Sequence, residues 1–313
     1  MNENKKNPTI LGEKYQLTTD LEGSGSYGKV YKAHLLSDPK QVVAVKVMTY
    51  ETDEGITSAS LKEISSLKNL KHINIISMLD VYFDRKAETC SVVMEHMELD
   101  LEGYIESLDQ PCDRALSASY MSQLLEGLAF MHSTGHIHCD IKPNNLLINL
   151  KGDLKICDFG LTTATLSKTY LRDCAHINTL WFRPPELLLG SNRATTAVDI
   201  WAAGCVLWRM VQMQHAFPGD SGIDTLYKIF ARMGLPTEQE WPGVTELPFW
   251  HENLPKFKRR FKKVTEHLSD EVVELLRGCW TLDPSQRVSA RSALQNPWIK
   301  VATEILQNTR EKL

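Results

Sequence analysis

Residues 138–145 of the chain read His138-Cys139-Asp140-Ile141-Lys142-Pro143-Asn144-Asn145. A carboxylate, an ammonium group and a carboxamide follow one another closely in this stretch, at Asp140, Lys142 and Asn145. Other short segments rich in glycine, proline or charge precede and follow it. They are Gly23-Ser24-Gly25-Ser26-Tyr27-Gly28 with Val30, Val43-Ala44-Val45-Lys46, Glu63, Asp158-Phe159-Gly160, Pro184-Pro185-Glu186, and Asp199 with Trp201 and Gly204.

Taken together, these segments resemble a protein kinase. A single Gly-rich hexamer is a weak indicator, but an accidental match of all the segments in one consistent order is very improbable. The Gly-rich segment lies between two predicted strands, which favours a kinase phosphate cover over a dinucleotide-binding turn. The resemblance covers residues 15–300 and implies ATP and Mg²⁺ as cofactors.

The composition is that of an ordinary globular protein. The chain of 313 residues is 42% hydrophobic and 24% charged, and its net charge of −4 argues against a dominant nucleic-acid or membrane-surface role. Seven cysteines without close metal-binding spacing and a polar start at residues 1–8 are typical of a reduced intracellular protein. We therefore expect no direct nucleic-acid partner, no membrane span, and a location in the nucleus, the cytoplasm or both.

Two kinds of periodicity divide the chain. Stretches of β-branched residues predict strands at residues 16–36, 41–49 and 89–96, with a turn at Ser37-Asp38-Pro39 between the first two. A helix is predicted over residues 58–70, where apolar residues recur at helical spacing and would pack on the sheet. These apolar residues are Leu61, Ile64, Leu67 and Leu70.

From Leu116 onward the helical period dominates. Further helices are predicted at residues 197–213, 222–233, 270–280 and 289–296. The expected fold class is therefore α+β, a bilobal protein-kinase fold with an antiparallel sheet and one helix in the N-lobe and a mainly helical C-lobe. The expected boundaries are an N-terminal tail at 1–14, the N-lobe at 15–97, the C-lobe at 98–300 and a C-terminal tail at 301–313.

The resemblance implies how the nucleotide is held. Lys46 would grip its α- and β-phosphates, and Glu63 would pair with Lys46 and fix its position. An unpaired ammonium group in the apolar strand 42–45 would be costly, which supports this pairing. Residues 95–98 would form the hinge that faces the adenine. The full set of expected ATP contacts is Glu22, Gly23, Ser24, Gly25, Ser26, Tyr27, Gly28, Lys29, Val30, Ala44, Lys46, Glu63, Glu95, Met97 and Leu147. Kinases usually have an aliphatic residue where this chain has Glu22.

The resemblance also assigns the catalytic roles. Asp140 would accept the proton of the substrate hydroxyl, and Lys142 would neutralise charge that develops on the γ-phosphate. Asn145 and Asp158 would be the magnesium ligands. A lysine two residues after the catalytic aspartate resembles serine/threonine kinases rather than tyrosine kinases. Thr179 is expected to bridge Asp140 and Lys142.

Other motif residues are expected to stabilise the fold. By resemblance, His138 and Phe159 would pack with Leu67 and Met78 in a column of side chains that links the lobes. We also expect Glu186 to pair with Arg287 in a buried bridge and Asp199 to support the catalytic loop from below.

Within the protein kinases, the chain is most similar to the cyclin-dependent kinases. Residues 54–63 resemble the helix with which that family binds a cyclin, so a cyclin-like regulatory subunit is expected to bind the region 54–67. Residues 180–187 match the substrate-side segment of proline-directed kinases. Segments at 97–101, 142–147 and 217–242 are most similar to the CDK-activating kinases.

Proline-directed specificity has a physical basis in this family. The residue before Thr179 adopts a left-handed backbone there, which leaves no carbonyl for a substrate amide, and proline has no such amide. Here that residue is Asn178, a type enriched at positive φ. The expected substrates are therefore proteins with Ser/Thr-Pro sites.

The activation segment departs from the family pattern. In cyclin-dependent kinases this segment is usually ordered by phosphorylation of one of its own threonines, and three arginines of the kinase hold the phosphate. The corresponding positions here are Cys174 for the threonine and Lys62, Cys139 and Thr163 for the arginines. Because the phosphate and its cradle are missing together, we hypothesise that partner binding alone activates the enzyme.

Two alternatives to a cyclin-dependent kinase remain open in the sequence, and so does the role of one basic run. The chain could be a pseudokinase scaffold, although Lys46, Asp140, Asn145 and Asp158 are all present. It could be a MAP-kinase-like enzyme that needs no cyclin, although residues 167–170 lack a Thr-x-Tyr pair. The basic run 256–263 could be a solvated face, or it could serve nuclear import or the docking of an acidic partner.

Overall fold

The computed structural model describes residues 9–25, 28–50, 55–165 and 180–310. The chain divides into two compact units. The sheet unit comprises Met1–Glu98 with Cys157–Gly160, and the helical unit comprises Leu99–Ile156 with Leu161–Leu313. A sheet with one helix in the first unit and mainly helices in the second confirm the α+β class predicted from the sequence.

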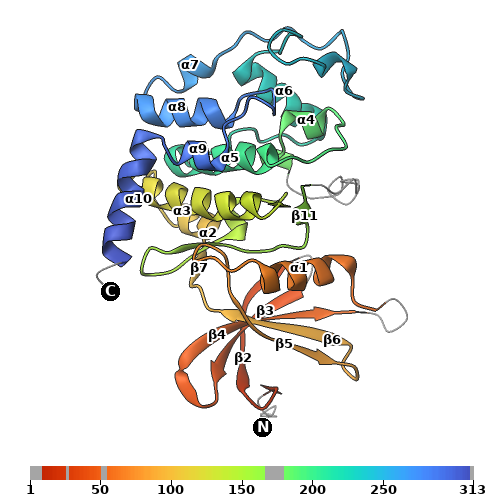
Figure 1. Cartoon of the computed structure of the whole chain (residues 1–313), viewed down its shortest axis with the longest axis vertical. Helices are drawn as coiled ribbons and strands as arrows, with labels where there is room; N and C mark the ends of the chain where they lie inside the picture. Colours follow the sequence, from red (N-terminus) through yellow and green to blue (C-terminus); the bar gives the residue numbers. More distant parts are fainter. Residues whose placement is uncertain (1–8, 26–27, 51–54, 166–179, 311–313) are drawn as a thin grey trace, which may run out of the picture. The chain divides into compact units, whose positions relative to one another are not determined.

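The sheet unit is built on an antiparallel sheet (Figure 1). Its strands lie in the order β1-β2-β3-β4-β6-β5. Their bounds are Ile10–Leu11 for β1, Tyr15–Gly25 for β2, Gly28–Leu35 for β3, Asp38–Thr49 for β4, Met78–Asp84 for β5 and Thr89–Glu95 for β6. Alternate side chains of β2, β3, β4 and β6 form a buried core of Tyr15, Ala33, Val43, Val45 and Val93.

Two details of the sheet differ from the prediction. Strand β5 was not predicted, because its alternation includes Asp80, whose carboxylate accepts a hydrogen bond from Tyr15 Oη at 2.5 Å. The turn between β3 and β4 lies at Leu36–Ser37, and Asp38 and Pro39 already belong to β4. Proline is tolerated near the start of a strand, so it does not mark the turn here.

Helix α1 (Ser58–Asn69) begins at Thr57, whose side chain accepts a hydrogen bond from the Ser60 amide. The prediction that Leu61 packs on the sheet is wrong, because this side chain is 52% exposed. Helical residues turn by about 100° each, so Leu61 lies roughly opposite Glu63, which is 2% exposed. The face of α1 that is buried is therefore the one that carries Glu63 and its ion pair, and not the face that would bury the most apolar side chains.

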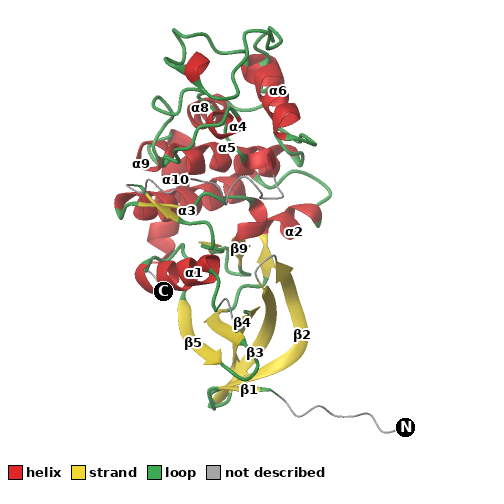
Figure 2. Cartoon of the chain, turned by 90° about the vertical axis from the view of Figure 1, so that its right-hand side faces the viewer, coloured by secondary structure: helices red, strands yellow, loops and turns green. Residues whose placement is uncertain are grey.

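The helical unit is dominated by helices (Figure 2). Its longer helices are α3 (Arg114–Ser133), α5 (Ala197–Gln212), α6 (Gly222–Met233), α8 (Asp270–Cys279) and α10 (Pro297–Arg310). Its shorter elements are β7 (Leu99–Asp100), α2 (Leu101–Glu106), β8 (His136–Ile137), η1 (Pro143–Asn145), β9 (Leu146–Ile148), β10 (Leu154–Ile156), β11 (Thr163–Ala164), η3 (Leu180–Phe182), α4 (Pro185–Leu188), η4 (Val244–Glu246), α7 (Phe261–Val264) and α9 (Ala290–Ala293). None of the helices in the described ranges is long and apolar enough to cross a bilayer.

Helix ends depart from the prediction mainly near the C-terminus. The helix predicted over 289–296 is the shorter α9, and α10 continues beyond residue 300 to Arg310. Pro297 opens α10, and proline is favoured in the first turn of a helix. The other long helices predicted in this unit agree with α5, α6 and α8 to within one residue at each end.

An aromatic cluster forms the centre of the helical unit. The Trp201 ring stacks on Phe217 at a centroid distance of 5.4 Å, and Trp208 lies 5.6 Å from Trp280. The Arg232 guanidinium lies 4.2 Å from the Trp208 ring centroid. This cation–π contact gives a partly buried cation a favourable environment.

Close packing between α5 and Trp280 depends on Gly204. A Cβ at this position would lie 2.7 Å from Cys279 Cβ and 2.8 Å from Trp280 Nε1. We expect Gly204→Ala to lower the free energy of unfolding by about 1–3 kcal/mol, because overpacking forces neighbours to move. Chemical denaturation of the full chain measures this.

The matched control is Gly222→Ala at the start of α6, where the added Cβ would meet only Leu188 Cδ2 at an ordinary 3.7 Å. This control should be neutral or slightly stabilising, because alanine restricts the unfolded chain. Equal destabilisation by both substitutions would contradict the packing argument.

Candidate active site

A buried ion pair connects strand β4 to helix α1 in the sheet unit. Lys46 Nζ donates to both carboxylate oxygens of Glu63 at 2.7 Å, and the two residues are 8% and 2% exposed. Burial alone would lower the pKa of Lys46, but the Glu63 and Asp158 carboxylates outweigh it, so the pKa is raised. The predicted pairing of Lys46 with Glu63 is thus present, and Lys46 remains a cation.

Asp158 is the third charged residue of this group. Its Oδ1 lies 4.0 Å from Lys46 Nζ. Asp158 has a positive φ of 63°, which is unusual for a residue other than glycine. Backbone strain of this kind occurs at functional positions, where the surrounding structure holds a side chain in a required direction.

The glycines of β2 and β3 have different roles. Gly28 has a φ of 154°, and a Cβ there would lie 2.5 Å from the Val47 carbonyl oxygen, so only glycine fits. Gly23 has no atom within 4 Å of the place where a Cβ would be. The open space beside the Gly23 backbone fits the close approach of a phosphate. Ser26 and Tyr27 lie outside the described residues.

The other expected ATP contacts lie on several elements. In the sheet unit, Ala44 is buried on β4, Met97 is buried after β6, and Lys29 and Val30 belong to β3. Glu95, at the end of β6, accepts a hydrogen bond from the Ser77 amide at 2.8 Å. Leu147 belongs to β9 of the helical unit. Glu22, Ser24 and Gly25 belong to β2.

The catalytic-loop residues predicted from the sequence lie together in the helical unit. Asp140 Oδ2 accepts hydrogen bonds from Lys142 Nζ and from Asn145 Nδ2, both at 2.8 Å. Asn145 Nδ2 also donates to the Asp140 carbonyl at 2.8 Å. The short helix η1 places Asn145 there, with its amide bonded to the Lys142 carbonyl at 2.9 Å. These bonds hold one carboxylate in a single orientation.

Asp199, in the first turn of α5, fixes the backbone of this loop. Its carboxylate accepts hydrogen bonds from the amides of His138 at 2.9 Å and Cys139 at 2.8 Å. Cys139 has a positive φ of 70°, and these two bonds hold that conformation. The prediction that Asp199 supports the loop is confirmed. Burial opposes its ionisation, but the hydrogen bond and charge of His132 lower the pKa of Asp199 overall.

His132 is a supporting residue that the sequence analysis missed. It lies at the end of α3, and its Nε2 is 2.8 Å from Asp199 Oδ2. Nothing in its local pattern separates it from an ordinary polar residue at a helix end. Its role becomes visible only when the fold brings α3 and α5 together.

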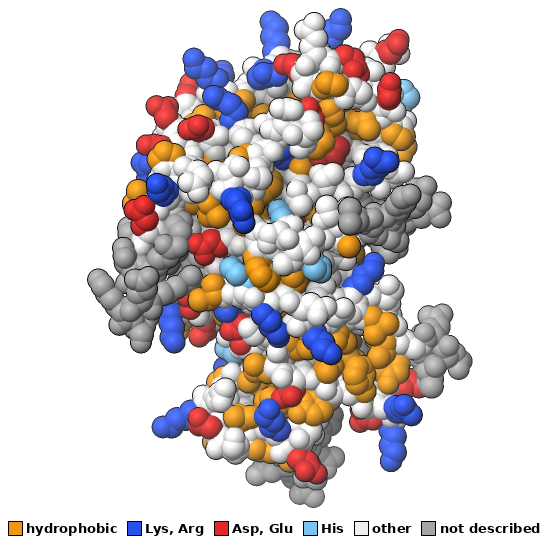
Figure 3. All heavy atoms as spheres, viewed as in Figure 1, with side chains coloured by type: hydrophobic (Ala, Val, Ile, Leu, Met, Phe, Trp, Pro, Cys, Tyr) orange, Lys and Arg blue, Asp and Glu red, His pale blue; other side chains and the backbone are white. Residues whose placement is uncertain are grey.

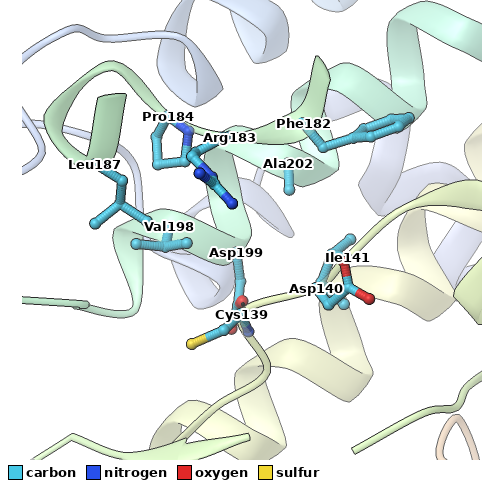
Figure 4. Close-up of a pocket in the computed structure, with 10 residues that line it drawn as sticks. All are labelled: Cys139, Asp140, Ile141, Phe182, Arg183, Pro184, Leu187, Val198, Asp199 and Ala202. Carbon is cyan, nitrogen blue, oxygen red and sulfur yellow. Dashed lines mark hydrogen bonds between the residues drawn. The ribbon is translucent and has the colours of Figure 1, made fainter. Parts of the chain in front are cut away.

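A small cavity of about 30 Å³ adjoins the loop, lined by Cys139 and Asp140 together with residues 182–184 and α5 (Figure 4). It is large enough for a water molecule. The Cys139 sulfur and the Asp140 carboxylate point in opposite directions from the loop (Figure 4). Thr179, Asn178 and Cys174 lie outside the described residues.

The predicted bridge between Glu186 and Arg287 is present. Arg287 Nη1 and Nη2 donate to the two Glu186 oxygens at 2.8 and 2.9 Å. Arg287 also donates to the Ala197 carbonyl at 2.8 Å, so it joins α4 to the start of α5. His138 and Phe159 are fully buried, as packing residues should be.

The expected magnesium ligands have suitable donor atoms. Asn145 uses its Nδ2 for hydrogen bonds, which leaves Oδ1 for a cation, and Asp158 supplies a carboxylate. Within the described ranges, no three His, Cys, Asp or Glu side chains form a metal site of protein groups alone. Mg²⁺ in kinases is usually bound by one or two protein groups and by substrate phosphates, so the donor atom of each residue, taken by itself, suits this ion.

An ammonium group held by two carboxylates beside a glycine-rich hairpin is the arrangement with which phosphotransferases grip a nucleotide. Comparison with known protein families agrees with this class, because residues 15–299 match the protein kinase domain. The chain therefore belongs to the protein kinase family, and its activity is the transfer of a phosphoryl group from ATP.

We expect Asp199→Asn to lower the free energy of unfolding by about 3–5 kcal/mol at neutral pH, because it removes one partner of a buried, charged hydrogen-bond group. Because the pKa of Asp199 is lowered in the folded state, its ionised carboxylate stabilises the fold at every pH above 3.8, the ordinary pKa of an aspartate. This stabilisation is lost as the pH falls through the pKa of Asp199 in the folded state. The difference between wild type and variant should therefore shrink in acid.

Denaturant titrations from neutral pH to about pH 4 and below measure this difference. Asp109→Asn, at an exposed position, is the matched control and should change stability little. A difference between wild type and Asp199→Asn that is constant over the whole pH range would contradict the assignment.

Proposed function

We propose that the protein is a magnesium-dependent serine/threonine protein kinase of the cyclin-dependent type that phosphorylates Ser/Thr-Pro sites in proteins. The observation that carries the serine/threonine assignment is the 2.8 Å bond between Lys142 and Asp140. A lysine held against the catalytic carboxylate from two residues away is the feature by which the sequence resembles serine/threonine kinases.

The geometry supports in-line phosphoryl transfer. The substrate hydroxyl oxygen forms a bond to the γ-phosphorus, the bond from that phosphorus to the β-γ bridging oxygen breaks, and the hydroxyl proton passes to Asp140 Oδ2. Lys142 stabilises the negative charge of the transferring group. Lys46, positioned by Glu63, binds the α- and β-phosphates. Most of the rate enhancement comes from positioning and electrostatic stabilisation, because phosphoryl transfer needs little covalent help from the protein.

Asn145 and Asp158 would hold the magnesium ion. When bound, the ion neutralises phosphate charge and orients the leaving group. The protein contributes one carboxamide oxygen and one carboxylate, both fixed by bonds or backbone conformation already described.

The surface of α1 supports the proposal of a cyclin-like partner at region 54–67. Leu61 projects from this helix and is 52% exposed, although an isolated sheet unit would gain by burying it. Ile73 and Leu79, in the segment after α1 and in β5, are also exposed. Apolar side chains gather on the sheet unit (Figure 3). A partner that covers α1 would also stabilise the inward position of Glu63.

We further propose that such a partner activates the kinase without a phosphothreonine. Lys62, Cys139 and Thr163 occupy the positions where the family has arginines. A phosphate is most strongly bound by bidentate guanidinium groups, and these side chains supply none. The strained backbone of Cys139 is held by Asp199, so this part of the loop needs no phosphate to order it.

Asp140→Asn should lower turnover by roughly 10²-fold or more, because it removes the group that accepts and orients the substrate proton. Transfer of radiolabel from ATP to Ser-Pro, Thr-Pro and Tyr-Pro peptides measures both turnover and specificity. Asp109→Asn is the control. Equal turnover of Asp140→Asn and wild type would indicate another catalytic base, and preferential labelling of tyrosine would contradict the serine/threonine assignment.

Leu61→Glu should abolish binding of the proposed cyclin-like regulatory partner and lower the partner-stimulated activity by at least tenfold, because a carboxylate would be buried at the interface. Leu36→Glu, at an exposed turn of the same unit, is the matched control. Pull-down and kinase assays measure both effects. Loss of partner-stimulated activity after phosphatase treatment of the complex would contradict activation without phosphate.

A further inference from the structure

A cluster of cations lies on the helical unit, far along the chain from the catalytic loop. Blue side chains gather over α7 and the segment before it (Figure 3). We name residues 256–263 the basic segment. Its six cationic residues are all exposed: Lys256, Lys258, Arg259, Arg260, Lys262 and Lys263.

The basic segment is anchored by the residues between its lysines. The Phe257 ring lies 5.8 Å from that of Tyr227 on α6, and Arg259 Nε donates to the Met233 carbonyl at 2.7 Å. Phe261 is buried, with its ring 6.4 Å from that of Trp280. The segment is therefore fixed at three successive points, two on α6 and one on the aromatic cluster around Trp280.

This anchoring determines where the cations point. The anchoring residues are every second one in this stretch: Phe257, Arg259 and Phe261. The side chains between them, Lys258 and Arg260, are therefore directed to solvent. The Arg260 amide donates to the Arg232 carbonyl at 2.9 Å, which further fixes the backbone. A row of cations on a fixed backbone loses less conformational entropy on binding than the same cations on a free tail.

Within the described ranges, most of these cations have no salt-bridge partner. Arg259 Nη2 pairs with Glu240 at 2.8 Å. For the part of the chain that the structure describes, no salt bridge involves Lys256, Lys258, Arg260, Lys262 or Lys263. The pair with Glu240 shows that the segment accepts a carboxylate, and the remaining cations are available for others.

We propose that the basic segment is a docking surface for a short, carboxylate-rich peptide segment of a partner or substrate protein. This inference concerns a surface away from the catalytic residues and holds for the chain whether or not its kinase specificity is as proposed. Opposite charges across an interface steer association and select partners.

The charge of the whole chain favours a short acidic peptide over a nucleic acid. The net charge is −4, so the chain without the basic segment is more negative still. A polyanion that extends beyond the segment would meet this negative remainder, whereas a short peptide would not. A nucleic acid is therefore an alternative outcome of the test.

Fluorescence anisotropy of the full chain with a labelled peptide of alternating glutamate and serine tests the proposal. A peptide of alternating glutamine and serine is the uncharged probe. The variant is Lys258→Glu with Arg260→Glu and Lys262→Glu. The matched control makes the same change in net charge at exposed positions elsewhere, with Lys151→Glu, Arg291→Glu and Lys300→Glu.

The wild type and the matched control should bind the acidic peptide, and the variant should bind it about tenfold more weakly or worse, as expected for three lost exposed ion pairs. Affinity should fall as salt is raised, because exposed charges are screened beyond about 10 Å at 0.1 M ionic strength. The same three positions changed to glutamine should fold as the wild type does and bind with an intermediate affinity.

Three results would overturn the proposal. One is an equal loss of affinity for the acidic peptide in the variant and in the matched control, because the effect would then come from the total charge of the chain and not from the basic segment. Another is equal binding of the acidic and uncharged peptides. The third is tighter binding of single-stranded DNA or of phosphatidylserine vesicles than of the acidic peptide, which would assign the surface to a different class of partner. Because no step requires ATP, a failure of the kinase assignment would not change these results.

Discussion

The three hydrogen bonds accepted by Asp199 are the constraint on which the candidate site depends. Two of them come from consecutive amides of the catalytic loop, and one comes from His132 on α3. A carboxylate buried without such donors would lose its charge. The loop therefore bends through Cys139 in a conformation that L-residues seldom adopt, and Asp140 follows directly from that bend.

The same principle operates in the sheet unit with the signs reversed. There a buried cation, Lys46, is held by two carboxylates, and α1 is oriented so that Glu63 points toward Lys46. Charge pairing overrides hydrophobic patterning at this point, since Leu61 is left exposed as a result. Each unit thus positions its functional groups around one buried charge that is paired with groups of opposite charge or polarity.

The pairs of the site that the family resemblance implies could be predicted from the sequence. The resemblance pairs Lys46 with Glu63 and Arg287 with Glu186, and the cost of an unpaired ammonium group in an apolar strand supports the first pair. His132 and the exposure of Leu61 could not be predicted, because each depends on how helices rotate and meet. The same holds for the anchored alternation of the basic segment, since a charge run in a sequence does not show which side chains face solvent.

The aromatic cluster around Trp280 has a practical consequence for spectroscopy. All seven tryptophans lie at or after residue 181, so the sheet unit contains none. Intrinsic tryptophan emission therefore reports on the helical unit alone. Loosening of the strands around Lys46 would leave that emission unchanged, and an optical probe placed among those strands would be required to observe it.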